Sequence, residues 1–211
     1  MTHPLAQSVF DTVNSLKGKP NTFASPPELT KNGAQTMCST FVTLMLNRTY
    51  DIAPVHFVAM FGKRWPRARD YYRAFDRLLL GGDTSMTLAM IEPGTVCGIG
   101  YDENRDAHSG HCFIVLEAPV STGDTRGKLN KYLLRVGDSS KSDHGPTDTR
   151  WMLKGQTGGI GIGNMALWVN DDGIVKGYSW SMENTSEVLY HGIGQSLAFA
   201  NIPKDWSLRN G

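Results

Sequence analysis

The fold is decided by a stretch near the N-terminus, Gln35-Thr36-Met37-Cys38-Ser39-Thr40-Phe41-Val42-Thr43-Leu44-Met45-Leu46, which follows a polar, proline-containing run over residues 25–33. Its apolar residues recur at the three- and four-residue spacing of a helix packed on a core. The spacing predicts a loop over 25–33 and then a buried helix ending near Asn47. Cys38 lies in the first turn of this helix, and Thr36 is expected to cap it from just outside.

A cysteine at the start of a helix is placed for chemistry. Unpaired backbone N–H groups and the positive end of the helix dipole both favour the thiolate, which is the nucleophilic form. The alternative is that Cys38 is a small buried core residue, as most free cysteines are. This stretch alone leaves both interpretations open.

Composition is that of an ordinary globular protein. A chain of 211 residues suits one domain with a full core, and we expect a single domain over residues 1–211. The formal net charge is +1, so no bulk field favours nucleic acid or a membrane surface, and neither is expected as a partner. No apolar run reaches membrane-spanning length, and the N-terminus lacks the pattern of a signal peptide. Localisation stays open between the cell envelope, secretion and the cytoplasm.

The three cysteines, Cys38, Cys97 and Cys112, form no disulfide framework. Whether Cys97 pairs with Cys112 stays open, and in either case Cys38 is the odd one out.

Helical periodicity is confined to the first part of the chain. Residues 4–17 are predicted to be a helix, and a helical insertion is expected at about 50–82. Within the insertion, 50–63 is apolar without a clear period, whereas a clearer helix opens at Pro66 and ends at Gly81-Gly82. Its arginines at 69, 73 and 77 suit a solvated face better than a phosphate-binding stripe, because acidic residues dilute their charge.

Strand-like runs follow the helices, at residues 95–99, 111–116, 132–138, 166–169, 174–178 and 197–202. The run at 111–116 is apolar on both alternating faces, as in a central strand covered on both sides. Helices first and strands after predict an α+β fold, with N-terminal helices packed on an antiparallel sheet.

A cysteine nucleophile needs a base and a third group that orients the base. Among six histidines, His111 stands out because it begins a buried strand directly after Ser109-Gly110. His111, Phe113 and Val115 share one face of that strand. We therefore expect the Cys38 helix to pack on that face and to bring the thiol to the imidazole.

Asp138 is the candidate third residue. If 111–117 and 132–138 form an antiparallel hairpin, pairing His111 with Asp138 centres the turn between Asp124 and Thr125, where turn residues occur. Asp138 would then hold the imidazole tautomer and stabilise the imidazolium. The alternative is a turn-forming aspartate. The coincidence of three positions favours Cys38, His111 and Asp138 as a catalytic triad.

Substrate contacts are expected beside the triad. The Cys38 N–H is a candidate oxyanion donor, and the Gln35 side chain is a second, unless it is an exposed loop glutamine. Ser39, Ser109 and Gly110 complete the predicted substrate-binding residues.

These motifs resemble the papain-like NlpC and CHAP group of cysteine peptidases and amidases. The resemblance rests on Cys38-Ser39-Thr40-Phe41-Val42, Pro93-Gly94-Thr95-Val96 and Gly110-His111-Cys112-Phe113-Ile114-Val115, followed by a polar third residue, and it covers residues of about 30 to 140. The chain departs from the family at Met37, where aspartate is frequent, at Thr40, where glycine is frequent, at Thr95, where aspartate follows Pro-Gly, and in the helical insertion.

The resemblance implies a papain-like NlpC-type α+β fold and amide hydrolysis through an acyl-enzyme on Cys38, with no cofactor and no metal. It implies that the substrate is a peptidoglycan stem peptide or another peptide, or the bond cut by an N-acetylmuramoyl-L-alanine amidase. An inhibitor or immunity protein would be a further partner.

Other readings stay open. Gly161-Ile162-Gly163-Asn164-Met165-Ala166 spells GxGxxA, but a strand-like run follows it where a dinucleotide site needs a helix. His108 and His111 form HxxH, which with Asp138, His144 or Cys112 would suit a zinc hydrolase, although an extended loop aligns two imidazoles poorly. The polar stretch over 138–151 is a surface loop or one wall of a cleft. A non-catalytic binding module and an acyltransferase on the same fold remain rivals.

Overall fold

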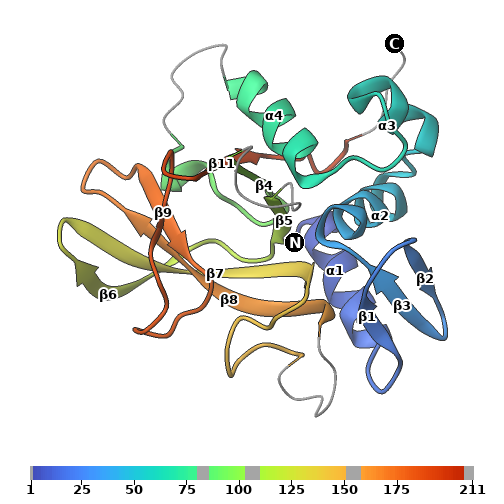
Figure 1. Ribbon diagram of the computed structural model, residues 1–211, viewed down its shortest axis with the longest axis horizontal. Coiled ribbons are helices and arrows are strands. Elements are labelled where there is room, and N and C mark those ends of the chain that lie inside the picture. Colours follow the sequence, from blue (N-terminus) through green and yellow to red (C-terminus); the bar gives the residue numbers. More distant parts are fainter. Residues whose placement is uncertain (1, 80–85, 103–109, 151–157, 207–211) are drawn as a thin grey trace.

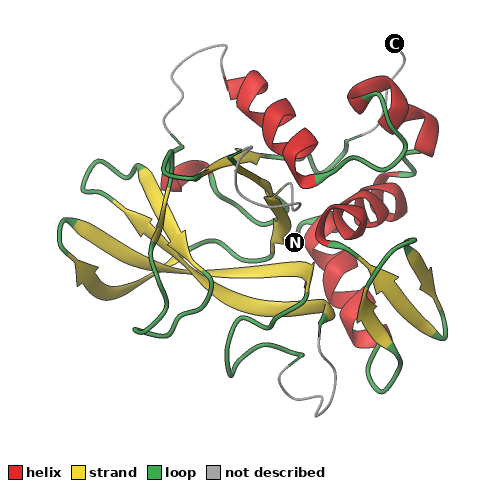
Figure 2. Cartoon of the chain, viewed as in Figure 1, coloured by secondary structure: helices red, strands yellow, loops and turns green. Residues whose placement is uncertain are grey.

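The computed structural model describes residues 2–79, 86–102, 110–150 and 158–206, and it confirms the α+β prediction (Figures 1 and 2). The described helices are α1 (Pro4–Ser15), α2 (Cys38–Tyr50), α3 (Pro54–Phe61) and α4 (Ala68–Leu79), with a short 3-10 turn η1 (Leu88–Met90). The described strands are β1 (Asn21–Phe23), β2 (Glu28–Thr30), β3 (Gly33–Thr36), β4 (Val96–Tyr101), β5 (Gly110–Val115), β6 (Val120–Arg126), β7 (Leu129–Ser140), β8 (Gly159–Val169), β9 (Val175–Ser179), β10 (Leu189–Tyr190) and β11 (Gln195–Ala200).

A curled antiparallel sheet dominates the molecule. Its strands run in the order β10-β9-β8-β7-β5-β4-β11, and β6 forms a hairpin on β7. The two ends of this order approach each other, and the hydroxyl of Tyr178 on β9 donates to the side chain of Gln195 on β11 at 2.7 Å. A separate small sheet, β1-β3-β2, lies beside α1 and α2 (Figure 1).

Each face of the curled sheet has its own hydrophobic core. The inner core fills the curl with side chains such as Phe113, Leu134 and Met165. The outer core lies between the sheet and helices α1, α2 and α4, and it includes Phe41 and Tyr71. Burial on both faces explains why the central strands read as continuous apolar runs.

Helix α2 packs on the opposite face of β5 from the one we expected. Its apolar side shares the outer core with Cys112 and Ile114, whereas Phe113 and Val115 point into the inner core. The prediction failed because a strand that is buried on both sides has no polar face to show which side meets the helix.

The sequence left open whether Cys97 and Cys112 form a disulfide. Both are free thiols, and they belong to different cores. Cys97 lies in the inner core and Cys112 in the outer core, so the sheet separates their thiols. Burial raises the pKa of both thiols well above the ordinary value, which leaves them protonated and unreactive near neutral pH.

Several boundaries differ from the sequence prediction. Helix α2 continues past Asn47 to Tyr50 and ends at Asp51, whose backbone is left-handed with φ 54°. The run over 25–33, expected as a loop, contains β2, and the unassigned segment from 50 holds α3. Strands β8 and β7 are longer than predicted, and none of the described helices is long and apolar enough to cross a membrane.

Helix α4 lies directly on β4 because β4 carries glycines there. A methyl group at Gly98 would lie 2.6 Å from the Tyr72 backbone nitrogen, and one at Gly100 would lie 2.6 Å from the Tyr72 ring. A backbone cannot yield without moving the helix, whereas a ring at the edge of a core can rotate.

We therefore predict that Gly98→Ala lowers the free energy of unfolding by about 1–3 kcal/mol, the usual cost of overpacking. Gly100→Ala is the matched control, with the same change on the same face of the same strand, and its loss should be smaller. Urea denaturation measures both. Equal losses would contradict the backbone contact.

Candidate active site

Cys38 is the first helical residue of α2, as predicted, and a pair of hydrogen bonds fixes this helix start against the sheet. The Thr36 hydroxyl donates to Ser139 Oγ at 2.9 Å, and Ser139 Oγ donates to the Thr36 carbonyl at 2.9 Å. Thr36 is thus not the cap that we expected. The N-cap is Met37, whose N–H donates to Thr40 Oγ1 at 2.8 Å. The tie joins the residues before Cys38 to the strand that carries Asp138.

His111 and Asp138 meet, as predicted. His111 Nε2 lies 2.8 Å from Asp138 Oδ2, and both side chains are buried. Cys38 lies beside the same imidazole, because its charge is the largest influence that raises the pKa of His111 and both residues line one cleft; since Nε2 faces the carboxylate, Nδ1 is the nitrogen left for the thiol. The three predicted residues therefore form a connected chain from sulfur to imidazole to carboxylate.

The strand register that led to Asp138 was wrong. Asp138 pairs across the sheet with Phe113, two residues beyond His111, so His111 and Asp138 are diagonal neighbours on the same face. The expected turn at 124–125 is inside β6, and the chain turns at 127–128 instead. Every residue of β6 is exposed, and such a strand has no apolar period to reveal it.

The electrostatics of His111 reflect its two partners. Burial by itself lowers the pKa of His111, but the charge at Cys38 and the hydrogen bond that His111 donates to Asp138 outweigh it and raise the pKa from 6.5 to about 9. The imidazole is accordingly protonated at neutral pH.

Behind Asp138 lies a buried charge cluster that sequence reasoning missed. Arg150 Nη2 lies 2.8 Å from Asp138 Oδ1 and 2.6 Å from Asp148 Oδ2, and Arg150 Nε donates to Asp148 Oδ1 at 2.9 Å. Asp138 Oδ1 accepts no well-aligned hydrogen bond, so the guanidinium compensates it chiefly through charge. His144 Nε2 adds a contact of 3.2 Å to Asp138 Oδ2.

This cluster keeps Asp138 ionised. Burial alone would raise the pKa of its carboxyl, but the Arg150 and His144 charges and the bonds from His111 and His144 hold that pKa well below the usual range. The same carboxylates raise the pKa of Arg150 against the effect of its burial. The polar stretch over 138–151 forms part of the cleft wall through Ser140, Lys141 and Ser142, which was one of the two alternatives, whereas Asp148, Arg150 and His144 are buried behind Asp138.

The glycines of the GxGxxA run make room for this cluster. A methyl group at Gly161 would lie 2.5 Å from Arg150 Nε, and one at Gly163 would lie 2.5 Å from Asp148 Oδ2. The run lies inside strand β8, so it has no helix after it and does not have the structure of a dinucleotide site. Its glycines are a local signal that other groups approach this strand closely, although they do not identify those groups.

An open cleft of about 690 Å³ contains the thiol and the imidazole. Trp180 forms part of its wall, with its indole ring centroid 4.9 Å from that of His111 and 4.4 Å from that of His144. The lining residues are Phe23, Ser25, Met37, Cys38, Ser39, Thr40, Trp65, Pro66, Arg67, Ala68, Tyr101, Gly110, His111, Ser140, Lys141, Ser142 and Trp180.

The predicted substrate contacts are only partly in this cleft. Ser39 and Gly110 line it, and the left-handed φ of Gly110 and its approach to the Ile99 carbonyl oxygen admit no side chain. Gln35 does not line it, because its amide donates to the Pro26 carbonyl at 2.9 Å, which removes it as an oxyanion donor. Ser109 lies outside the described residues.

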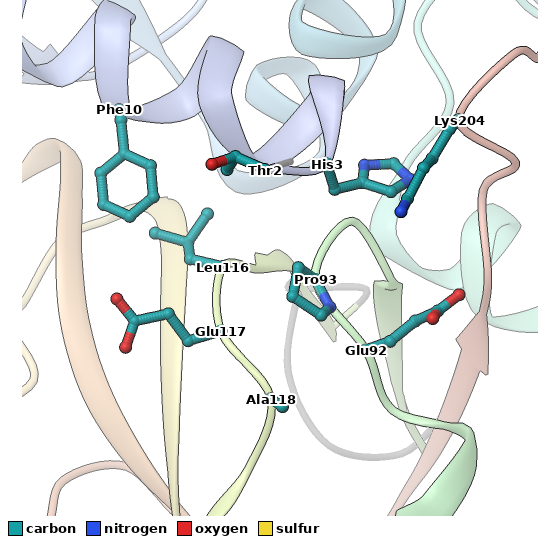
Figure 3. A pocket seen from close by; sticks show the side chains of 9 residues that line it. All are labelled: Thr2, His3, Phe10, Glu92, Pro93, Leu116, Glu117, Ala118 and Lys204. Carbon is teal, nitrogen blue, oxygen red and sulfur yellow. The ribbon is translucent and has the colours of Figure 1, made fainter.

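A second cavity, of about 520 Å³, lies between the start of α1 and the β5–β6 connection (Figure 3). Its lining includes His3, Glu92, Glu117 and Lys204 but no member of the Cys38 chain. Both nitrogens of His3 are engaged, Nε2 with the Ile202 carbonyl at 2.8 Å and Nδ1 with the Leu5 N–H at 3.2 Å. Among its described lining residues the cavity therefore offers no cysteine and no free imidazole.

Within the described residues, no group of three or more His, Cys, Asp or Glu side chains is arranged to hold a metal ion. His111 Nε2 is engaged by Asp138, and His108, the partner in the HxxH reading, lies outside the described residues.

Comparison with known proteins adds one relative. Over 165 residues, which cover 73% of this chain and 72% of the other, the sequence is 27% identical to an uncharacterized protein of Acanthamoeba polyphaga mimivirus. No family model matches the chain, and no solved structure matches it.

The pair formed by Cys38 and His111 predicts a titration. Because the charge at Cys38 is the largest cause that raises the pKa of His111, Cys38→Ser should lower that pKa from about 9 toward its ordinary value. Protonated His111 stabilises the folded state fully below about pH 6.5, and this contribution disappears as the pH rises through about 9. NMR of the ring protons reports the shift, with Cys97→Ala in the inner core as control. An unchanged His111 titration in Cys38→Ser would contradict the pair.

The buried ion pair predicts coupled stabilities. Asp138→Asn and Arg150→Gln should each cost about 3–5 kcal/mol of unfolding free energy, because each leaves buried charge without its partner. The double variant should lose clearly less than the sum of the two. Chemical denaturation of the four proteins gives the coupling energy, and strict additivity would show that the two groups do not interact.

Proposed function

We propose that this protein is a cysteine-dependent amide hydrolase with a papain-like fold of the NlpC and CHAP type, acting on peptide bonds of bacterial peptidoglycan. The observation that carries the proposal is the buried chain from Cys38 through His111 to Asp138 at the start of α2, opening into a cleft. The cell-wall substrate rests on the resemblance of the motifs around Cys38, Pro93-Gly94 and His111 to that group.

The proposed reaction begins with the thiolate of Cys38, which is stabilised by protonated His111. The sulfur attacks the amide carbonyl carbon, and the oxyanion accepts hydrogen bonds at the start of α2, where the first N–H groups have no intrahelical partner. His111 then gives its proton to the leaving amine, and the C–N bond breaks to leave an acyl-enzyme. Water, deprotonated by His111, releases the acid and regenerates the thiol.

Asp138 is proposed to orient the imidazole. Its carboxylate holds His111 through Nε2 and so presents Nδ1 to the sulfur. Arg150 and His144 act one step further out as positioning residues, because they keep this carboxylate ionised and fixed without lining the cleft themselves. The Thr36–Ser139 tie holds the nucleophile helix in register with the same strand.

Alkylation tests the proposal without a known substrate. We expect iodoacetamide to label Cys38 rapidly at pH 7 and to leave buried Cys97 and Cys112 unlabelled under native conditions. His111→Ala should slow labelling about tenfold, because an unassisted thiol is only slightly ionised at that pH. Site-resolved mass spectrometry measures the rates, and a chelator control separates a thiol enzyme from a zinc hydrolase.

The matched activity assay follows amine release from peptidoglycan and stem peptides. His111→Ala should reduce kcat by roughly 10²–10⁴-fold, and Cys38→Ala should abolish the acyl-enzyme seen by mass spectrometry. A Cys38 that is inert, or that reacts equally well without His111, would refute the hydrolase and favour a binding module. An acyl-enzyme that is discharged only by an added amine would favour the acyltransferase.

A further inference from the structure

The cleft around Cys38 is lined by positive charges that have no carboxylate partner among the described residues. Among its described lining residues, Arg67 and Lys141 are basic and none is acidic. Arg67 lies in the connection before α4, and Lys141 follows β7, so the two charges come from different segments bordering the cleft. Both residues are exposed.

Some other basic side chains of the described residues form ion pairs with carboxylates. Lys63 pairs with Asp70 at 3.0 Å, Arg135 with Glu117 at 2.6 Å, and Arg150 with two aspartates. Within the described residues, Arg67 and Lys141 form no ion pair with a carboxylate. Their charges are therefore available to a bound molecule.

The nearest carboxylate of the site does not cancel this field. Asp138 is fully buried and does not line the cleft, and Arg150 pairs with it from behind. Protonated His111 and the Cys38 thiolate of the proposed pair carry opposite charges, so Arg67 and Lys141 supply the excess positive charge of the described lining. A cleft with charges of one sign and low-dielectric walls concentrates ligands of the opposite sign.

Aromatic rings complete the walls. Trp65, Tyr101, Trp180 and Phe23 all line the cleft. The ammonium of Lys141 lies 5.9 Å from the centroid of the Phe23 ring, which supports its stem at the rim. The lining thus combines flat apolar surfaces with cations that can engage a carboxylate.

We propose that the cleft selects acidic peptides, with a carboxylate beside the scissile amide held by Arg67 and Lys141. This inference rests on the proposed amide hydrolase and names the charge of its substrate. Arg67 and Lys141 determine specificity and take no part in bond breaking.

A pair of alkylating probes tests the charge selection. Iodoacetate and iodoacetamide react with the Cys38 thiolate by the same displacement of iodide, but only iodoacetate carries a negative charge. A change in the reactivity of the Cys38 thiolate affects both rate constants equally. The ratio of the two rate constants therefore reports only the electrostatic field in the cleft. A small neutral thiol in solution gives the reference ratio.

At low ionic strength we expect iodoacetate to be favoured at Cys38 relative to the reference thiol. Arg67→Gln and Lys141→Gln should each lower the ratio about twofold, and the double variant about fourfold, as expected for single exposed charges that act on the same cleft through water. The effect should shrink as salt rises. The control is Lys128→Gln, the same charge change in the exposed turn between β6 and β7, which should leave the ratio unchanged.

Peptides provide the second arm. With amides that differ only in glutamate or glutamine beside the cleaved bond, the glutamate peptide should have the higher kcat/KM, and the double variant should remove the preference through KM. An unchanged probe ratio in the double variant overturns charge selection, even where His111 dependence is intact. The opposite outcome is a probe ratio that falls in the double variant together with alkylation that does not depend on His111. That result would refute the proposed hydrolase and would support a cleft that selects anions.

Discussion

The compensation of one buried carboxylate organises the site. Asp138 is fully buried at the end of β7, and an uncompensated charge there would cost several kcal/mol. Arg150, His111 and His144 surround it from the loop beyond β7 and from the neighbouring strand β5. The ion that orients the proposed base is therefore also what holds that loop against the sheet.

The demands of this cluster extend into the sheet. The side chains of Arg150 and Asp148 occupy the space into which strand β8 would normally project side chains. Gly161 and Gly163 of β8 have no side chain and leave this space free. Glycine in a strand interior is unfavourable because it loses more conformational entropy on folding than other residues. A run of glycines in a strand therefore indicates that other groups approach the strand closely. The glycine pattern that resembles a nucleotide motif is explained by packing against charged side chains.

Sequence predicted the elements whose apolar residues follow a regular pattern, on one side for the helices and on both sides for the central strands. The first three predicted helices show apolar stripes, and the inner strands show apolar runs, because each has a regular relation to a core. The exposed strand β6 and the three-residue strands β1 and β2 have no such relation and were missed. The face of β5 that meets α2 was equally hidden, since both faces of that strand are apolar.

The residues of the candidate site were predictable where they carry a local sequence signal. A cysteine at a helix start, a histidine at a strand start and an aspartate on a later strand each carry a local signal. The proximity of His111 and Asp138 was correct although the register was not, because diagonal neighbours on one face still meet through long side chains. The ion pair of Arg150 with Asp138 depends on the path of a loop, and no local pattern specifies such a path.

The two cores explain why the site lies where it does. Cys38 belongs to the outer layer of helices, whereas His111 and Asp138 share the strand faces that point into the curl. A continuous sheet would keep these groups apart, and only at the ends of β5 and β7 can a helix outside the sheet meet side chains from within. The tie between Thr36 and Ser139 joins the two layers at that edge, so it controls the distance from sulfur to imidazole.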